Sequence, residues 1–216
     1  MACLEIWHRF NEVKPFLVDV LASDRIETWV TMPAERLNIG RTGPYGGDPQ
    51  IFIVAHHVGR NHLRITAFGE GFVVTDLMTI NGTWVNDAKL GAAHALRDGD
   101  IIHVAEENRD RATTLVFHAN VGAYTCDPTE QALVDAVRAR TDGSRAIYAD
   151  WLEDRGDRAR ATFLRIRDSL DRLEAGSDFE EHVRACYAAN ERFDPAWRLA
   201  ILTDTTGTPG ASDRGT

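Results

Sequence analysis

The feature that most constrains the fold of this chain is a change in the spacing of its apolar residues near Cys126. Before that point, Gly, Asp and Asn separate short runs in which apolar residues alternate, at 4–7, 16–20, 51–54, 62–65, 71–74, 82–85, 101–104 and 114–117. Alternation with period two is typical of strands, and many short strands with frequent turn signals predict a β-sandwich. Asp98-Gly99-Asp100 predicts a tight turn just before one of these strands.

After Cys126 the apolar period lengthens toward 3.6 residues, which predicts helices. Asp127 followed by Pro128 is typical of a helix start, because Asp caps the first turn and Pro fits its first position. On the second helix, Tyr148, Trp151 and Leu152 are spaced to form one core-facing stripe. We expect the later helices near 147–152, 163–173 and 179–193, and a short last one from 195 onward.

The two patterns together predict a multidomain β + α protein. We expect a β-sandwich over residues 1–122 and a small all-α domain over residues 127–202. Residues 203–216 are mostly Thr, Gly, Asp, Pro and Ser, and they carry too little apolar surface to order themselves. That segment is therefore expected to be a disordered tail.

Composition narrows the class of protein. The 216 residues carry a net charge of −9, which argues against a general nucleic-acid binder. Neither a run of roughly 20 apolar residues nor a signal peptide is found, so membrane insertion and secretion are not expected. The three cysteines, Cys3, Cys126 and Cys186, lack zinc or disulfide spacing. A cytoplasmic protein is the expectation.

Four short motifs follow one another in the β-rich part. They are Gly40-Arg41, Gly59-Arg60-Asn61-His62, Ile80-Asn81-Gly82-Thr83 with Asn86, and Leu96-Arg97-Asp98-Gly99-Asp100-Ile101-Ile102. The set resembles the forkhead-associated (FHA) family, whose pattern is Gly-Arg, Ser-x-x-His, Asn-Gly-Thr-x-x-Asn and Leu-x-x-Gly-Asp-x-Ile. Each motif alone is weak, but four in this order form a specific signal over a core of residues 36–118. The resemblance implies a β-sandwich that binds phosphothreonine peptides as a signalling adaptor.

The resemblance also implies roles for individual residues. Arg41 would grip the phosphate, Asn81 would hold the peptide main chain, and Arg60 would help to contact the ligand. Gly59 and Ile80 occupy two further phosphopeptide-binding positions. Structural roles in the loops fall to Gly40, His62, Gly82, Thr83 and Asn86.

These residue types suit that ligand. A phosphothreonine has a charge near −2 and three acceptor oxygens. A guanidinium donates forked, charge-assisted hydrogen bonds to such a group. An asparagine side chain both donates and accepts, so it can bind a peptide backbone without selecting a sequence.

Two positions depart from the family pattern. Gly59 stands where the family has Ser, and Ile80 stands where it has Thr or Ser, while Thr79 lies one position earlier. A hydrogen bond to a charged group contributes about 1.5–3 kcal/mol, so two lost hydroxyls would weaken phosphate binding roughly tens to thousands of fold. The backbone N–H at Gly59 and the charge of Arg60 would reduce this loss. The alternative function is a degenerate FHA scaffold that binds partners without phosphate, for instance in a secretion or envelope-associated assembly.

The helical part carries a second resemblance. The block Tyr148-Ala149-Asp150-Trp151-Leu152-Glu153-Asp154-Arg155-Gly156-Asp157 resembles a small helical companion domain of multi-domain proteins from myxobacteria and planctomycetes. That family has no established role. In a signalling adaptor, the helical domain would tether or position a complex whose phosphothreonine a Ser/Thr protein kinase writes.

Other chemistries are less well supported. His56, His57 and His62 match no common zinc spacing, and no cysteine or carboxylate cluster joins them. Asp150, Glu153, Asp154 and Asp157 are typical of the solvated face of an amphipathic helix. The glycines near Arg41 lack the Gly-Lys-Ser of a nucleotide loop. We therefore expect neither metal, cofactor nor catalytic residue, and a binding module in place of an enzyme; a catalytic site would need a pocket that holds Asp150, Asp154 or His182.

Overall fold

The computed structural model describes residues 1–7, 14–17, 27–32, 35–41, 51–54, 57–105, 113–170 and 193–202, with single residues at 181, 185 and 189. Twelve strands in the first part and helices in the second follow the order expected from the apolar spacing. The expected fourth helix near 179–193 falls largely outside the described residues, and the expected tail at 203–216 falls wholly outside them.

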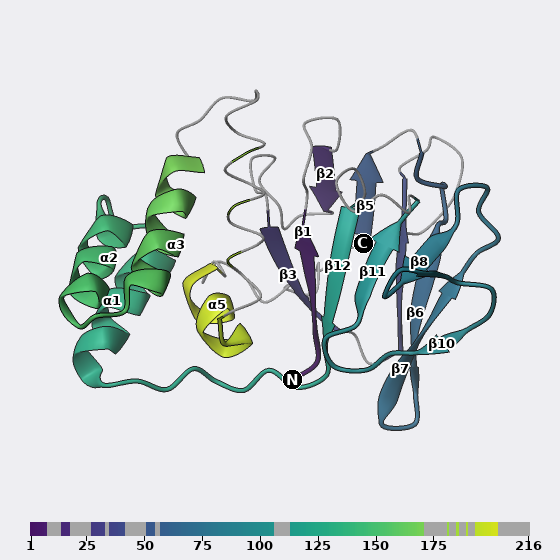
Figure 1. Ribbon diagram of the computed structural model, residues 1–216. Helices are drawn as coiled ribbons and strands as arrows, with labels where there is room; N and C mark the ends of the chain where they lie inside the picture. The colour runs from purple at the N-terminus through teal and green to yellow at the C-terminus, as the bar shows by residue number, and fades with distance from the viewer. Residues whose placement is uncertain are drawn as a thin grey trace, which may run out of the picture.

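The strands form two six-stranded sheets (Figure 1). The first sheet has the order β3-β1-β12-β11-β8-β9 and the second the order β10-β7-β6-β4-β5-β2. Neighbouring strands are antiparallel apart from β4 and β5, which run parallel. The strands are β1 (Cys3–Trp7), β2 (Lys14–Leu17), β3 (Glu27–Thr31), β4 (Arg36–Gly40), β5 (Ile51–Val54), β6 (Leu63–Phe68), β7 (Gly71–Asp76), β8 (Thr83–Val85), β9 (Ala88–Lys89), β10 (His94–Ala95), β11 (Ile101–Val104) and β12 (Thr113–His118).

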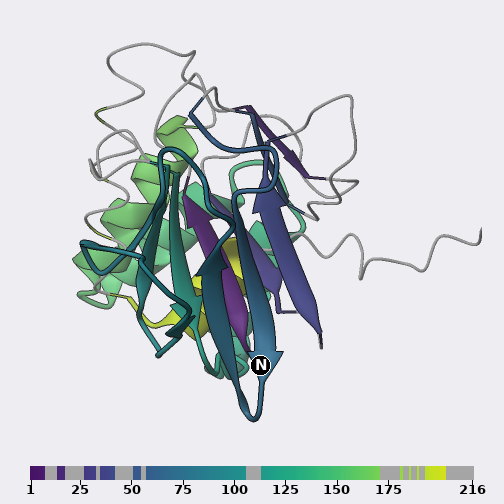
Figure 2. The same ribbon diagram turned by 90° about the vertical axis from the view of Figure 1, so that its right-hand side faces the viewer.

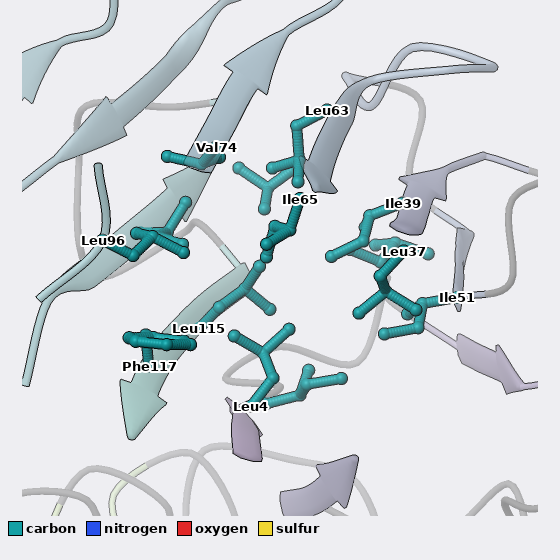
Figure 3. Close-up of a cluster of buried hydrophobic side chains, with 14 of the residues drawn as sticks. Leu4, Leu37, Ile39, Ile51, Leu63, Ile65, Val74, Leu96, Leu115 and Phe117 are labelled. Carbon is teal, nitrogen blue, oxygen red and sulfur yellow. The ribbon is translucent and has the colours of Figure 1, made fainter. Parts of the chain in front are cut away.

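The sandwich core follows from the strand alternation. Every second residue of a strand points to the same face, so the inner faces of both sheets supply one apolar layer. Figure 3 shows side chains of the two sheets facing one another, among them Leu4 and Leu115 of the first sheet and Ile39 and Ile65 of the second. All four are fully shielded from solvent. The predicted β-sandwich is therefore confirmed.

The tight turn predicted at Asp98-Gly99-Asp100 is present. Gly99 has φ +81, a conformation that glycine adopts without steric cost, and the Asp100 N–H donates to the Arg97 carbonyl at 3.0 Å. At the same end of the sandwich, β6 and β7 are joined by a hairpin that forms the foot of the molecule in both views (Figures 1 and 2).

The helices are α1 (Pro128–Arg138), α2 (Ser144–Asp154), α3 (Arg158–Leu170) and α5 (Pro195–Leu202). The predicted start of α1 is confirmed: the Asp127 carboxylate accepts from the N–H groups of Thr129 and Glu130, and Pro128 occupies the first turn. On α2, Tyr148 and Leu152 are buried and Trp151 is half-buried, with the Arg155 guanidinium 3.7 Å from the centre of its ring. Ile147, on the same helix, lies outside this stripe and is 58% exposed.

A polar network at the centre of the helical part joins Tyr124, which precedes α1, to α1, α2, α3 and α5. The Glu130 carboxylate accepts hydrogen bonds from Tyr124 at 2.9 Å, Tyr148 at 2.5 Å and Arg160 at 2.9 Å. Burial raises the pKa of Tyr124 to about 12. The hydrogen bond to Glu130 acts in the same direction, because a second negative charge beside this carboxylate is unfavourable. The Trp197 indole of α5 donates to the Tyr148 hydroxyl at 3.0 Å, so the network reaches the last helix.

Helix α5 lies between the other helices and the sheet that contains β1, β3 and β12 (Figure 1). The outer face of β1 is covered there: Trp7 is fully buried and belongs to the helical core together with Trp197. Glu5, also fully buried, is paired with Arg198 of α5 and with His118 of β12 at 2.8 Å. Burial acts to raise the pKa of Glu5, but the hydrogen bond from His118 and the charge of Arg198 outweigh it and hold that pKa below its usual value.

Candidate functional site

Three loops meet at the end of the sandwich opposite the β6–β7 hairpin (Figure 1). They are the end of β4 at Gly40 and Arg41, the segment 57–62 before β6, and the segment 77–82 between β7 and β8. The Arg41 N–H donates to the Gly59 carbonyl at 2.7 Å, and the Asn81 side-chain amide donates to the His57 carbonyl at 2.5 Å. Motifs that are far apart in the sequence are thus brought into direct contact.

His62 connects two of these loops from a fully buried position. Its Nδ1 accepts from the Gly59 N–H at 2.9 Å, and its Nε2 lies 2.8 Å from the Gly82 carbonyl. Because Nδ1 is an acceptor, Nε2 must carry the proton and donate, which is the neutral form of the ring. Burial lowers the pKa of His62 and favours the same form.

Glycine is required at two motif positions. A Cβ atom at Gly40 would lie 2.1 Å from the Arg60 carbonyl oxygen, which is backbone and cannot turn aside. Gly82 has φ +79, and a Cβ there would also lie 2.7 Å from the side chain of Lys89. Both glycines therefore allow loops to approach closely, as their predicted structural role implies.

Asp76, for which the motif comparison predicts no role, organises the loop between β7 and β8. Its Oδ1 accepts from the Thr79 N–H at 2.9 Å, and its Oδ2 accepts from the hydroxyls of Thr79 at 2.8 Å and Thr83 at 2.7 Å. Burial acts to raise the pKa of Asp76, but the hydrogen bonds from Thr83 and Thr79 hold it below its usual value. An Asp three residues before a Thr at a strand end is the local signal that could have identified it.

Asn86, the residue directly after β8, fixes the loop before β11 through hydrogen bonds of its side chain. Its amide donates to Asp100 Oδ1 at 2.7 Å, and its oxygen accepts from the Ile101 N–H at 3.0 Å. The second oxygen of Asp100 accepts from the Arg97 N–H at 2.8 Å and lies 3.0 Å from His94 Nε2. Asn86 and Asp100 of the last two motifs thus hold one another and fix the loop before β11.

The two cationic residues of the predicted site, Arg41 and Arg60, differ in exposure, but both have guanidinium groups that remain available to a ligand. Arg41 is half-buried at the end of β4, and Arg60 is exposed on the adjacent loop. Within the part of the chain that the structure describes, neither guanidinium takes part in a hydrogen bond or an ion pair. Their donors are therefore available to an anion from outside, which is the chemistry that a phosphate needs.

The structure shows what surrounds Gly59 and Ile80, the two positions that depart from the family pattern. A Cβ at Gly59 would lie 3.0 Å from the Thr79 methyl group, so Thr79 already fills the space beside it. The Thr79 hydroxyl is used inside the loop, since it donates to Asp76 and accepts from the Gly82 N–H at 3.1 Å. Ile80 points into solvent and is 99% exposed. Thr79 therefore does not replace the missing hydroxyl at position 80.

Two of the acidic residues considered above, Asp150 and Glu153, form ion pairs on the surface. Asp150 and Glu153 both accept from the Arg165 guanidinium on the surface, at 2.8 Å and 2.5 Å. A cavity of about 490 Å³ lies between the sandwich and the helices, with Trp29, Arg138 and Leu199 in its lining, and neither Asp150 nor Asp154 contributes to it. His182 lies outside the described residues.

Neither a membrane-spanning helix nor a metal cluster occurs within the described ranges. No helix there has the length and apolar character needed to cross a bilayer. No group of three or more His, Cys, Asp or Glu side chains there has the arrangement of a metal site. His56, one of the three histidines considered as metal ligands, falls outside those ranges.

Comparisons with solved structures find several FHA domains. One is the FHA domain of FhaA complexed with the intracellular domain of Rv3910 (23% identity over 55% of this chain and 100% of that chain, TM-score 0.38). Another comes from a study of phosphothreonine-dependent FHA domain interactions (22% identity, 54% and 95%, TM-score 0.37). A third is Mycobacterium tuberculosis EmbR in complex with a low-affinity phosphopeptide (26% identity, 42% and 21%, TM-score 0.36).

A search of curated protein sequences finds no match to this chain. The family model described as "FHA domain" matches residues 37–105, which include all four motifs and the three loops that meet at one end of the sandwich. The matched residues begin in β4 and end just after β11, so they lie inside the two-sheet sandwich. This protein is therefore an FHA domain protein, in which the N-terminal sandwich is the FHA domain and helices follow it.

Proposed function

We propose that this protein is an intracellular adaptor whose FHA domain binds a phosphothreonine segment of a partner protein. The observation that carries the proposal is the pair of guanidinium groups of Arg41 and Arg60, on loops that the buried His62 bridge organises. Within the described ranges these groups have no carboxylate partner, so a phosphate can take their hydrogen bonds without displacing one. Asn81, exposed on the third loop, would hold the peptide main chain.

The same proposal covers the organisation of the chain. Residues 1–122 would act as the binding domain, and residues 127–202 as a helical companion domain that tethers or positions the complex. A Ser/Thr protein kinase would write the phosphothreonine, and the cytoplasm is the compartment where such a kinase and adaptor meet. The relatives whose structures concern phosphothreonine-dependent interactions and phosphopeptide binding support this choice of ligand.

The proposal is tested by titrating the protein with a phosphothreonine peptide library and the matched unphosphorylated library, followed by calorimetry on selected peptides. We expect binding only to phosphorylated peptides, and about a tenfold to hundredfold loss of affinity in Arg41→Ala, because a charge-assisted hydrogen bond contributes about 1.5–3 kcal/mol. Arg140→Ala, which removes an arginine on the helical side, is the matched control. Equal binding to both libraries, or an unchanged affinity of Arg41→Ala, would refute the adaptor function.

A second function is favoured by one specific observation. Gly59 and the fully exposed Ile80 supply no hydroxyl for a phosphate. An FHA scaffold that binds its partner without phosphate, within a secretion or envelope-associated assembly, would need none. The same titration separates the two functions, because the scaffold would bind phosphorylated and unphosphorylated ligands alike.

A further inference from the structure

Two large apolar side chains project from the loop between β7 and β8. Met78 is 95% exposed and Ile80 is 99% exposed, more than any other large apolar side chain in the described part of the chain. A single exposed apolar residue is ordinary on a protein surface. Two of them on one loop, at the end of the sandwich where the guanidinium groups lie, indicate a contact with a ligand.

The direction of these side chains is built into the loop. Thr79, between them, is turned inward and bound through both its N–H and its hydroxyl to Asp76. Met78 has φ +57, in the left-handed region that residues with a side chain rarely adopt. The hydrogen bonds to Asp76 hold this unfavourable conformation, so the loop keeps Met78 and Ile80 in solvent before any ligand arrives.

The loop is in contact with the proposed phosphate-binding residues. Gly59 approaches the Thr79 methyl group and accepts from the Arg41 N–H, while Asn81 is bound to the carbonyl of His57. An apolar surface that is rigid in advance loses little conformational entropy when a ligand covers it. A ligand that complements this end of the sandwich therefore carries an anionic group and a large apolar side chain.

We infer that Met78 and Ile80 select phosphothreonine peptides with a large aliphatic or aromatic side chain near the phosphorylated residue. This inference rests on the proposed function, because the guanidinium groups are the part of the site that requires the phosphate. The apolar contact supplies affinity at the place where the family's hydroxyl is missing.

The test uses the full chain and two phosphothreonine peptides. The first comes from the library screen and has Leu or Phe near the phosphothreonine. The second is the same peptide with Ser in place of that apolar residue. We expect the apolar peptide to bind more tightly to the natural protein. The double variant Met78→Ala/Ile80→Ala, which adds no hydroxyl at position 80, should lose about tenfold or more of its affinity for that peptide. Its affinity for the Ser-containing peptide should stay nearly the same.

The control variant is Phe68→Ser, which removes an apolar side chain that is 77% exposed at the β6–β7 hairpin, the far end of the sandwich. It should bind both peptides as the natural protein does. Equal affinity of the natural protein for both peptides, with binding still weakened about tenfold to hundredfold by Arg41→Ala, would overturn the inference and leave the proposed function intact. Binding that ignores the phosphate would overturn the proposed function, and with it the peptide class inferred here.

Discussion

At the scale of single residues, His62 is the centre of the candidate site. It uses one ring nitrogen as an acceptor for Gly59 and the other as a donor to Gly82, and burial excludes water from both. A protonated ring could not accept from the Gly59 N–H, since both nitrogens would then be donors. The bridge between the loops therefore requires the neutral ring.

This requirement predicts a pH dependence of stability. Because the pKa of His62 is lowered in the folded protein, its contribution to stability is full above the unfolded value of 6.5 and is lost as the pH falls through the folded value. We expect His62→Gln, which keeps a donor and an acceptor but does not titrate, to reduce the pH slope of the unfolding free energy below pH 6.5 by up to about 1.4 kcal/mol per pH unit. Urea unfolding at several pH values measures the slope, and identical slopes for both proteins would contradict the prediction.

At the scale of elements, the loop between β7 and β8 is a rigid turn organised by Asp76. Its hydrogen bonds to Thr79 and Thr83 decide which side chains face inward. One result is that the Thr79 methyl group lies beside Gly59, where the family has a serine. Two sequence departures, at positions 59 and 80, are thus linked through one intervening side chain.

This contact predicts how the missing serine can be restored. In Gly59→Ser the new Cβ would lie 3.0 Å from the Thr79 methyl group, so the substitution alone is expected to give little gain. In Gly59→Ser/Thr79→Ser the methyl group is gone while the hydroxyl for Asp76 remains. The double variant should bind phosphopeptide about tenfold or more tightly, as expected for one added hydrogen bond to a charged group.

Calorimetry with one phosphothreonine peptide compares the natural protein, the two single variants and the double variant. Thr79→Ser alone is the control, and its affinity should match that of the natural protein. An affinity of the double variant no greater than that of Thr79→Ser would show that a serine at position 59 does not reach the phosphate.

At the scale of the whole molecule, helix α5 joins the FHA sandwich to the other helices. Trp197 packs in the helical core with Trp7 of β1, and Arg198 pairs with Glu5 of the same strand. The Arg198 guanidinium also lies 5.1 Å from the centre of the Trp29 ring on β3. These contacts connect the first strand to a helix near the other end of the described chain.

We expect the sandwich and the helices to unfold together. Arg198→Ala would leave Glu5 buried without its guanidinium partner, and removing one member of a buried ion pair costs about 3–5 kcal/mol. Tryptophan fluorescence and far-ultraviolet circular dichroism should report one urea transition, shifted to lower urea in the variant. Arg165→Ala, which breaks an exposed pair, should leave the midpoint nearly unchanged.

Separate transitions for the two signals would contradict this prediction. So would an Arg198→Ala variant as stable as Arg165→Ala.

Several features of the fold were predictable because local sequence encodes them. The alternation of apolar residues predicts the strands, and the Asp127 cap with Pro128 predicts the start of α1. The glycine at position 40 indicates a close approach of two loops, although only the structure shows the Arg60 carbonyl that requires it. The strands β3, β4, β9 and β10 were not predicted, since short segments have weak local preferences and depend on their neighbours in the sheet.

The sequence by itself determined the sandwich, the order of the motifs and the presence of Arg41, Arg60 and Asn81, because spacing and residue chemistry are local properties. Only the tertiary structure decided that Thr79 turns toward Asp76 and that Met78 and Ile80 face solvent, since this depends on hydrogen bonds that one carboxylate makes within a folded loop. It also decided that both faces of β1 are buried. The second face is covered by α5, and no local pattern can indicate a contact between residues nearly 200 positions apart.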